Sequence, residues 1–314
     1  MMQTLALGID IGGTNTSFGI VNRLGAIVAQ GTMPTTGHTT VAQYIAALAV
    51  SLNELLRQVD MSRVVGIGVG APNGNFYTGE ILFAPNLPWK GVAIPIAKML
   101  SDVMSLPCTL TNDANAAALG EMKYGIAKGL NDFVVVTLGT GVGSGFVANG
   151  KLVYGHDGFA GELGHVIAVR NGRSCGCGRF GCLEAYCSAT GIVATANQWI
   201  AEGKYPHSIL HSSQPLSALS IYNAAIAGDT LALDIFDYTA LILGQTLADI
   251  VAITSPEAII FFGGLAHSGD VLLKPVKQYL ENELLNIYKN KVKILSSALP
   301  GADAAILGAS ALVW

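Results

Sequence analysis

The chain has 314 residues and a formal net charge of −4, and 51% of its residues are hydrophobic while only 12% are charged. This length favours two domains, and a cleft between them would be the usual place for a ligand. The negative charge and the lack of a basic run exclude nucleic acid as a partner, and without a span of about 20 apolar residues no membrane segment is expected.

Apolar patterning predicts an α/β unit in the first part of the chain. Apolar residues at spacings of three or four predict helices over 39–59 and 92–105. Continuous or alternating apolar runs predict strands over 5–11, 17–21, 26–31, 64–72 and 108–113. The turns GGTN and NRLG join the first three strands, which indicates a meander of hairpins.

The second half of the chain restarts the first. Its segment FVVVTLGTGVGSGFVANGKLV aligns with the first hairpin at one constant offset, so that Gly12 meets Gly139 and Ser17 meets Ser144. A duplication explains this match, and the alternative is a chance match of two glycine-rich turns. The remaining segments are predicted as a largely helical region, a buried strand ending in Gly-Gly and an Ala-rich helix, over 190–245, 255–265 and 303–312.

The two glycine-rich turns are candidates for binding a nucleotide. Glycines allow the main chain to approach a polyphosphate, and the carboxylate of Asp10 would suit a hydrated Mg²⁺. The ending Gly-Lys-Ser/Thr of a P-loop is absent, and a simple tight turn with a capping Asp is the alternative. The candidate residues in the two turns are Asp10, Gly12, Gly13, Thr14, Asn15, Gly139, Thr140 and Gly141.

Asp113 is the candidate catalytic base. It ends the strand CTLTND, and a carboxylate there is well placed to accept a proton from an attacking hydroxyl. The same residue would also suit the N-cap of the helix that follows, and the two roles are compatible.

Three cysteines and a histidine have the composition of a closed zinc site. Cys175, Cys177 and Cys182 follow His165 closely, and three thiolates with one imidazole complete a tetrahedral shell. The alternative is a cluster of buried thiols. An ion held by four protein ligands has no open position for water, so we expect a structural Zn²⁺.

These motifs identify the chain as similar to the ROK family of sugar kinases, and within it to the bacterial glucokinases. DIGGT, APNLPW, NDAN, LGTGVGSG, ELGH, CGCGRFGCLE and FFGG carry the resemblance over nearly the whole chain. The resemblance implies an α/β, actin-like ATPase fold of the hexokinase and Hsp70 type, with duplicated glycine-rich hairpins around an interdomain cleft. The implied domains are 1–113, completed by a helix at about 303–314, and a larger 114–302 that holds the zinc site.

The resemblance also implies ATP-dependent transfer of phosphate to the 6-hydroxyl of a hexose, with D-glucose as the expected sugar. Asp113 would be the base, His165 would contact both zinc and sugar, and Gly263 with Gly264 would lie against adenosine. Ser144 departs from the family pattern, where an apolar residue is usual. The residues that resemble sugar ligands are Asn73, Gly74, Asn86, Asn112, Glu162, His165 and Glu184.

Two alternative functions remain, and the sequence also carries expectations for localisation and oligomeric state. A kinase for N-acetylmannosamine or another hexose is the main competitor, and a sugar-responsive regulator would need a DNA-binding segment before the first strand, where about four residues stand. The start MMQTLALGID has neither the basic region nor the long apolar core of a signal peptide, which predicts a cytoplasmic protein. A homodimer is expected from the resemblance.

Overall fold

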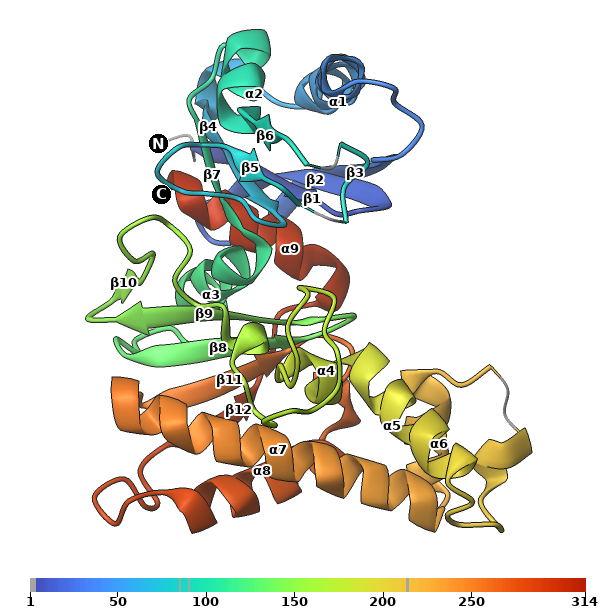
Figure 1. Ribbon diagram of the computed structural model, residues 1–314. Coiled ribbons are helices and arrows are strands. Elements are labelled where there is room, and N and C mark those ends of the chain that lie inside the picture. Colours follow the sequence, from blue (N-terminus) through green and yellow to red (C-terminus); the bar gives the residue numbers. More distant parts are fainter. Residues whose placement is uncertain (1–3, 85, 90, 213–214) are drawn as a thin grey trace.

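The computed structural model describes residues 4–84, 86–89, 91–212 and 215–314, so Pro85 of the motif APNLPW lies outside the described residues. Two five-stranded sheets lie one above the other, with helices between them (Figure 1). The first sheet has the order β3 (Ile27–Pro34), β2 (Asn15–Asn22), β1 (Leu5–Ile11), β4 (Val64–Ala71) and β7 (Cys108–Asn112). The second has the order β10 (Lys151–Leu152), β9 (Val142–Ala148), β8 (Phe133–Leu138), β11 (Ala258–Phe262) and β12 (Lys293–Ser296).

The two sheets share one topology. In each, the first strand pairs antiparallel with the second strand of its hairpin and parallel with a later strand on its other side. The later strand in turn pairs parallel with the last strand of the sheet. This shared order supports the predicted duplication more strongly than the matching glycines do.

The turns of the two hairpins differ in length. Ile11 pairs with Thr16 in the first hairpin, whereas Leu138 pairs with Val142 in the second. The first turn is therefore one residue longer, and one constant offset does not align both strands of the two hairpins. The predicted match of Ser17 with Ser144 is a match of sequence and not of cross-strand position.

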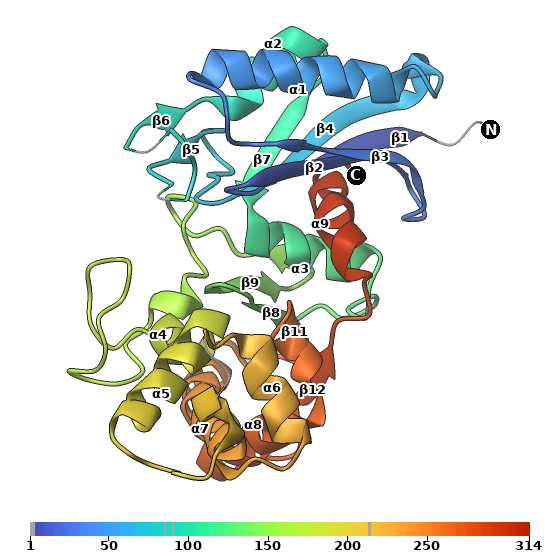
Figure 2. The same ribbon diagram turned by 90° about the vertical axis from the view of Figure 1, so that its right-hand side faces the viewer.

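Helices cover both faces of the first sheet. α1 (Val41–Leu56) and α2 (Ile96–Met104) lie on one face, and α9 (Gly301–Ser310) lies on the other (Figure 2). An ideal Cβ on Gly68 of β4 would lie 1.9 Å from the carbonyl oxygen of Ala309, so only glycine permits this close approach.

α3 (Asp113–Lys123) lies between the two sheets and packs against strands of both. Ala117 and Ala118 face the core of the second sheet, while Ala116 lies against Gly70 of the first. Because α3 belongs to both cores, the division of the chain at residues 113 and 302 stays a prediction.

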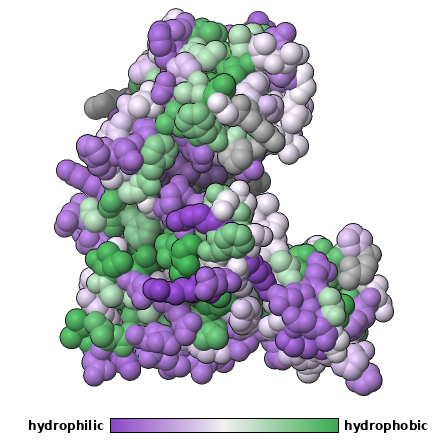
Figure 3. Space-filling model, in the orientation of Figure 1, coloured by the Kyte–Doolittle hydropathy of each residue, from purple (hydrophilic) through white to green (hydrophobic). Residues whose placement is uncertain are grey.

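The largest core packs the second sheet against a helical layer. The longest of its helices, α7, is the helix among the described residues that is long and apolar enough to cross a membrane by length and composition, but 61% of its most apolar window is buried inside the protein. Burial of this kind is typical of a core helix, and hydrophilic and hydrophobic residues are interspersed over the face of the molecule in Figure 3. The helices of this layer are α4 (Glu184–Cys187), α5 (Ala189–Ala201), α6 (Ala218–Ile226), α7 (Thr230–Thr254) and α8 (Asp270–Glu283).

Several predicted boundaries are wrong. The helix expected over 92–105 begins at Ile96, because Ala93–Ile94 forms the short strand β6 with β5 (Ile81–Leu82). Asp113 lies in the first turn of α3 and not in the preceding strand. α8 and β12 were not expected at all, since Pro275 interrupts the helical pattern of α8 and β12 is short. Short 3-10 turns lie at Met61–Arg63, Leu163–His165, Ile209–Ser212, Ala266–Ser268 and Ala311–Val313.

Candidate active site and metal cluster

A cleft of about 400 Å³ opens at the carboxyl ends of parallel strands in the first sheet and faces the turn of the second hairpin. Ligands of open α/β sheets bind at such strand ends. The predicted residues that line it are Asn73, Asn86, Asn112, Asp113, Gly139, Thr140, Gly141, Glu162, Glu184 and Gly263.

The other predicted residues lie beside this cleft or in neighbouring cavities. Gly74 lines a small cavity next to the cleft, and Gly264 lines an apolar pocket on its other side. The first turn, which holds Gly12, Thr14 and Asn15, closes with a hydrogen bond of 3.0 Å from Gly12 N to Asn15 O. An ideal Cβ on Gly13 would lie 2.5 Å from Asn86 O, so this turn packs directly on the loop that bears Asn86.

Two carboxylates, Asp10 and Asp113, flank Gly70. An ideal Cβ on Gly70 would lie 3.7 Å from Asp10 Oδ1 and 3.8 Å from Asp113 Cα. Burial, and then the negative charge of Asp113, raises the pKa of Asp10 to about 7. Asp113 is exposed to the cleft but surrounded by protein on its other sides, and this desolvation raises its pKa as well.

The raised pKa of Asp10 predicts a pH-dependent stability. The folded chain keeps a proton on Asp10 up to about pH 7, whereas the unfolded chain loses it near the ordinary pKa of 3.8. The free energy of unfolding should therefore fall as the pH rises between these values. Asp10→Asn should remove this slope and, without Mg²⁺, stabilise the protein at pH 8 by on the order of 3 kcal/mol.

Thermal unfolding of the parent and Asp10→Asn from pH 4 to pH 8 measures this effect. The two proteins should melt together near pH 4, diverge as the pH rises toward 7, and keep a constant difference above about pH 7. Asp102→Asn is the control, because this acid is exposed on α2 and pairs only with Lys98. Parallel pH profiles for the parent and Asp10→Asn would contradict the assignment of a buried carboxylate pair.

Asn112, and not Asp113, is the N-cap of α3. The Oδ1 atom of Asn112 accepts a hydrogen bond from Ala114 N at 2.8 Å, and Asp113 Oδ1 accepts from the same N–H at 2.8 Å. The N-cap position therefore belongs to Asn112, while Asp113, in the first turn, also accepts an N–H of that turn, and its charge there suits the helix dipole. Because its oxygen is engaged, Asn112 offers its amide Nδ2 toward a ligand.

Glu184 connects the cysteine loop to the second glycine-rich turn. Its Oε2 atom accepts a hydrogen bond from Val142 N at 3.0 Å, and its Oε1 atom lies 3.8 Å from Cys175 Sγ. An ideal Cβ on Gly141 would lie 2.3 Å from Oε2, so a side chain at this position would displace the carboxylate. The predicted sugar ligand thus has one oxygen engaged by the backbone.

Contacts with α5 hold the second glycine-rich turn. Ala189 N donates to Gly139 O at 2.8 Å, and Thr190 Oγ1 donates to Thr140 O at 3.0 Å. Gly263 approaches the same turn at a φ of 100°, and an ideal Cβ there would lie 2.7 Å from Leu138 O. Glycine at position 263 is therefore required by both its conformation and its surroundings.

An apolar pocket of about 420 Å³ adjoins this turn and was not expected from the sequence. Gly139, Thr140 and Gly264 line its inner end, and Leu219 and Tyr222 of α6 line its outer wall. The pocket lies beside the second glycine-rich turn, a candidate for binding phosphates, so its position suits the flat base of a nucleotide. Leu219 is 66% exposed on a helix with an ordinary apolar pattern, so no local signal marks it.

A smaller cavity of about 30 Å³ lies between Asn112 and Glu162. Sequence reasoning did not mark most of its lining as part of a site, including Asn115 and Gly161. Asn115 is 3% exposed, and its Oδ1 atom has no hydrogen-bond partner among the described residues. Glu162 faces the adjoining cleft, where burial raises the pKa of its carboxyl.

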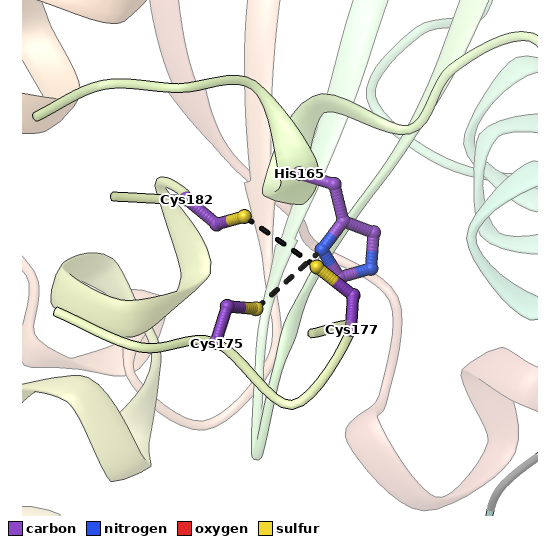
Figure 4. A group of neighbouring side chains, drawn as sticks. All are labelled: His165, Cys175, Cys177 and Cys182. Carbon is purple, nitrogen blue, oxygen red and sulfur yellow. Dashed lines mark hydrogen bonds between the residues drawn. The ribbon is translucent and has the colours of Figure 1, made fainter. Parts of the chain in front are cut away.

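The predicted metal ligands converge on one point (Figure 4). The ligand atoms of His165, Cys175, Cys177 and Cys182 all lie within 4.8 Å of one another. Cys175 Sγ is 3.8 Å from His165 Nδ1, and Cys177 Sγ is 3.6 Å from Cys182 Sγ. Bonds of about 2.0 to 2.3 Å to a central Zn²⁺ fit such separations.

The cluster also has chemistry that suits a cation. Burial raises the pKa of the thiols of Cys175 and Cys182, and a bound cation would offset this cost. The backbone N–H of Arg179 lowers the pKa of Cys177 to about 6, which favours its thiolate. Nδ1 of His165 faces the sulfur atoms, so its Nε2 remains for a second contact. Cys108 and Cys187 lie outside the cluster, as predicted.

Comparisons with known proteins find full-length relatives. The family model described as ROK family matches residues 6–314. A glucokinase of Halalkalibacterium halodurans is 36% identical over 98% of this chain and 94% of its own, and an N-acetylmannosamine kinase of Escherichia fergusonii is 31% identical over 99% and 98%. The crystal structure of a ROK family glucokinase from Streptomyces griseus with glucose and AMPPNP superposes with a TM-score of 0.81 at 32% identity, covering 98% of both chains.

Proposed function

Because this chain belongs to the ROK family, we propose that it is an ATP-dependent hexose kinase that converts D-glucose to glucose 6-phosphate. Membership confirms the resemblance and the actin-like, two-domain α/β fold that it implied. The observation that carries the proposal is the cleft itself, where the carboxylate of Asp113 lies between polar side chains and a glycine-rich turn. Such a site suits transfer of a phosphoryl group to a hydroxyl.

Asp113 acts as the general base in this proposal. The sugar 6-hydroxyl oxygen attacks the γ-phosphorus of ATP, the bond between this phosphorus and the β,γ-bridging oxygen breaks, and ADP leaves. Asp113 accepts the hydroxyl proton. Desolvation raises the pKa of its carboxyl, which makes the ionised form a better proton acceptor.

Mg²⁺ is the proposed partner of the ATP phosphates. The described lining of the cleft holds Asp113, Glu162 and Glu184 but no Lys or Arg. Backbone N–H groups of the two turns alone leave the phosphate charge largely unbalanced. A hydrated Mg²⁺ beside Asp10 would neutralise it. Burial, and then repulsion from Asp113, raises the pKa of Asp10, and a hard cation at this position would offset both costs.

The adenosine would occupy the apolar pocket beside the second turn. Gly263 and Gly264 would lie along it, and Tyr222 and Leu219 would contact the base. The triphosphate would then run from this pocket along Thr140 toward Asp113. This direction places the γ-phosphate where the sugar wall of the cleft begins.

The sugar would bind to polar groups that line the other end of the cleft. His165 would contact the sugar through Nε2 while Zn²⁺ holds Nδ1, so the metal would fix the ring that reads the substrate. The other proposed ligands of the sugar hydroxyls are Asn73, Gly74, Asn86, Asn112, Glu162 and Glu184.

Glucose is expected to be the best acceptor in a panel that includes mannose, allose, fructose, N-acetylglucosamine and N-acetylmannosamine. A polar wall penalises a misplaced hydroxyl, because each buried partner left unpaired costs about 1–3 kcal/mol, or about 5- to 150-fold in kcat/KM. The measurement is coupled ADP release for each sugar under identical ATP and Mg²⁺.

An N-acetylmannosamine kinase is the second candidate, favoured by the relative with that activity. The cavity next to Asn112 and Glu162, at about 30 Å³, is too small for an acetamido group, whereas the adjoining cleft, at about 400 Å³, has room for one, so the sugar panel decides between the two candidates. If either acetylated sugar outruns glucose in the panel, this candidate replaces glucokinase.

We also propose that the enzyme is cytoplasmic and forms a homodimer, the commonest symmetric assembly. It would act on sugar and ATP without nucleic acid or a membrane as partner. Light scattering of the purified enzyme tests the dimer directly.

A further inference from the structure

Two loops from opposite sheets meet at the sugar end of the cleft. Residues 74–81 form a tight hairpin after β4, closed by the bridge between Gly74 and Ile81. Residues 153–162 lead from β10 to Glu162, and in Figure 1 the chain after β10 rises toward the first sheet. The contact between these loops involves no residue that the sequence motifs single out.

Asn75 holds both loops with one side chain. It is 1% exposed, and its Oδ1 atom accepts hydrogen bonds from Tyr77 N at 2.9 Å and Thr78 N at 3.2 Å, within its own loop. Its Nδ2 atom donates to Asp157 O at 2.6 Å, across to the other loop. The amide oxygen therefore holds the loop that contains Asn75, and the amide nitrogen joins this loop to the other one.

Other groups reinforce this crossing. Tyr77 Oη donates to Gly155 O at 3.0 Å, and the ring of Phe76 stacks on that of Tyr154 at a centroid distance of 4.1 Å. Gly158 has a φ of 89°, and an ideal Cβ there would lie 2.6 Å from Asn75 Nδ2. The second loop thus fits closely over the amide of Asn75.

The contact extends to Glu162 through a short path. Ala160 N donates to Tyr154 O at 3.0 Å and closes the second loop, and Ser144 Oγ donates to the carbonyl of Gly161. Glu162 follows directly. A shift of residues 154–160 would therefore move the carboxylate of Glu162 relative to Asn112.

We propose that Asn75 and Tyr77 are positioning residues for sugar binding. Their hydrogen bonds to the carbonyls of Asp157 and Gly155 join the two sides of the cleft and hold Glu162 at the distance from Asn112 that a bound sugar requires. This inference rests on the proposed function for its substrate. It adds to that function a structural coupling in which neither residue touches the sugar.

Asn75→Asp tests the coupling without dismantling the loop. Aspartate keeps the acceptor for Tyr77 N and Thr78 N but removes the donor to Asp157 O. We expect KM for glucose to rise about 5- to 50-fold, with kcat and KM for ATP within about 3-fold of the parent. Tyr77→Phe, which removes one exposed hydroxyl, should raise KM for glucose by a smaller factor in the same direction.

Amide hydrogen exchange supplies a readout that does not depend on activity. In Asn75→Asp, peptides that cover residues 153–162 should exchange faster, while those of β9 should not change. Thr78→Ala is the matched control, because the hydroxyl of Thr78 accepts a hydrogen bond from Glu80 N within the same loop and does not reach across to residues 153–162.

The outcomes separate the two proposals. If the parent phosphorylates no sugar of the panel, the proposed function fails, and the exchange experiment still tests the contact. If exchange over 153–162 is unchanged in both Asn75→Asp and Tyr77→Phe, the coupling is wrong, whatever the activity of the parent. In an active parent, an unchanged KM for glucose in both variants overturns it as well. A loss in kcat with unchanged KM would also overturn it.

Discussion

Replacing Asp113 with Asn is expected to lower kcat by about 10²- to 10⁴-fold while glucose still binds. The amide keeps the size of the carboxylate and can hydrogen-bond the 6-hydroxyl, but it cannot accept the proton. It also still accepts from Ala114 N through its oxygen, so the first turn of α3 stays intact. Because Asn112 is the N-cap, little of the effect should come from a weakened helix.

Single-turnover kinetics and calorimetric titration with glucose measure the two parts separately. The dissociation constant for glucose should stay within a few-fold of the parent, and thermal stability at pH 8 should not fall, since a partly desolvated charge has been removed. Asp102→Asn on the exposed face of α2 should leave kcat unchanged. Turnover of Asp113→Asn within a few-fold of the parent would remove Asp113 from the mechanism.

Those parts of the site that rest on local sequence were predictable. Cys175, Cys177 and Cys182 stand close together in the chain, and turns containing glycine bring their sulfur atoms to His165. The two glycine-rich hairpins likewise carry their signal within a few residues. The second turn lines the cleft, and the first packs on the loop that bears Asn86, while their role in binding a nucleotide stays a prediction. In such segments, short-range geometry determines which side chains meet.

Contacts between distant segments could not be read in the same way. Asn75 and Asp157 meet only because the two sheets stack, and nothing near Asn75 in the sequence marks a partner on the other sheet. The apolar pocket depends in the same manner on how α6 packs beside the second turn. A sequence pattern predicts which face of a helix or strand is buried, whereas the segment that packs against that face depends on the tertiary structure.

Apolar patterns predict some elements of this fold and miss others. β1 and β8 are almost completely buried and read clearly as apolar runs. β12 is an edge strand of four residues with intermediate burial, so it resembles a loop. In α8 the interior Pro275 suggests a break, but the helix continues because burial of Leu272, Val276 and Leu280 outweighs one missing hydrogen bond.

Loss of the zinc ion is expected to lower both the thermal stability of the protein and its affinity for glucose. One Zn²⁺ per chain should copurify, and Cys177→Ser should abolish it, because Cys177 is one of the four ligand atoms within 4.8 Å of each other. Structural zinc sites contribute about 10–16 kcal/mol of apparent binding energy in small domains. In this chain the site orders one loop of an already packed sheet, so we expect a smaller loss, of about 5–15 °C in Tm.

The loss should reach the sugar through His165 and Glu184. Without the metal, Nδ1 of His165 loses its partner, and the loop that brings Cys175 to Glu184 loosens. We expect the affinity for glucose to fall at least about 10-fold. KM for ATP should rise by a smaller factor, because Glu184 links the cluster to the second glycine-rich turn, whereas the described lining of the apolar pocket contains none of the four cluster residues. Elemental analysis, thermal unfolding and glucose titration of the same preparations measure the three effects.

Cys108→Ser is the matched control, since it makes the same change at a cysteine outside the cluster. Removing zinc from the parent with a chelator should lower its stability and its affinity for glucose as Cys177→Ser does. Added Zn²⁺ should then restore both properties in the parent but not in Cys177→Ser. Active parent enzyme that contains no zinc would refute the site, and zinc-free Cys177→Ser with normal glucose affinity would separate the metal from sugar recognition.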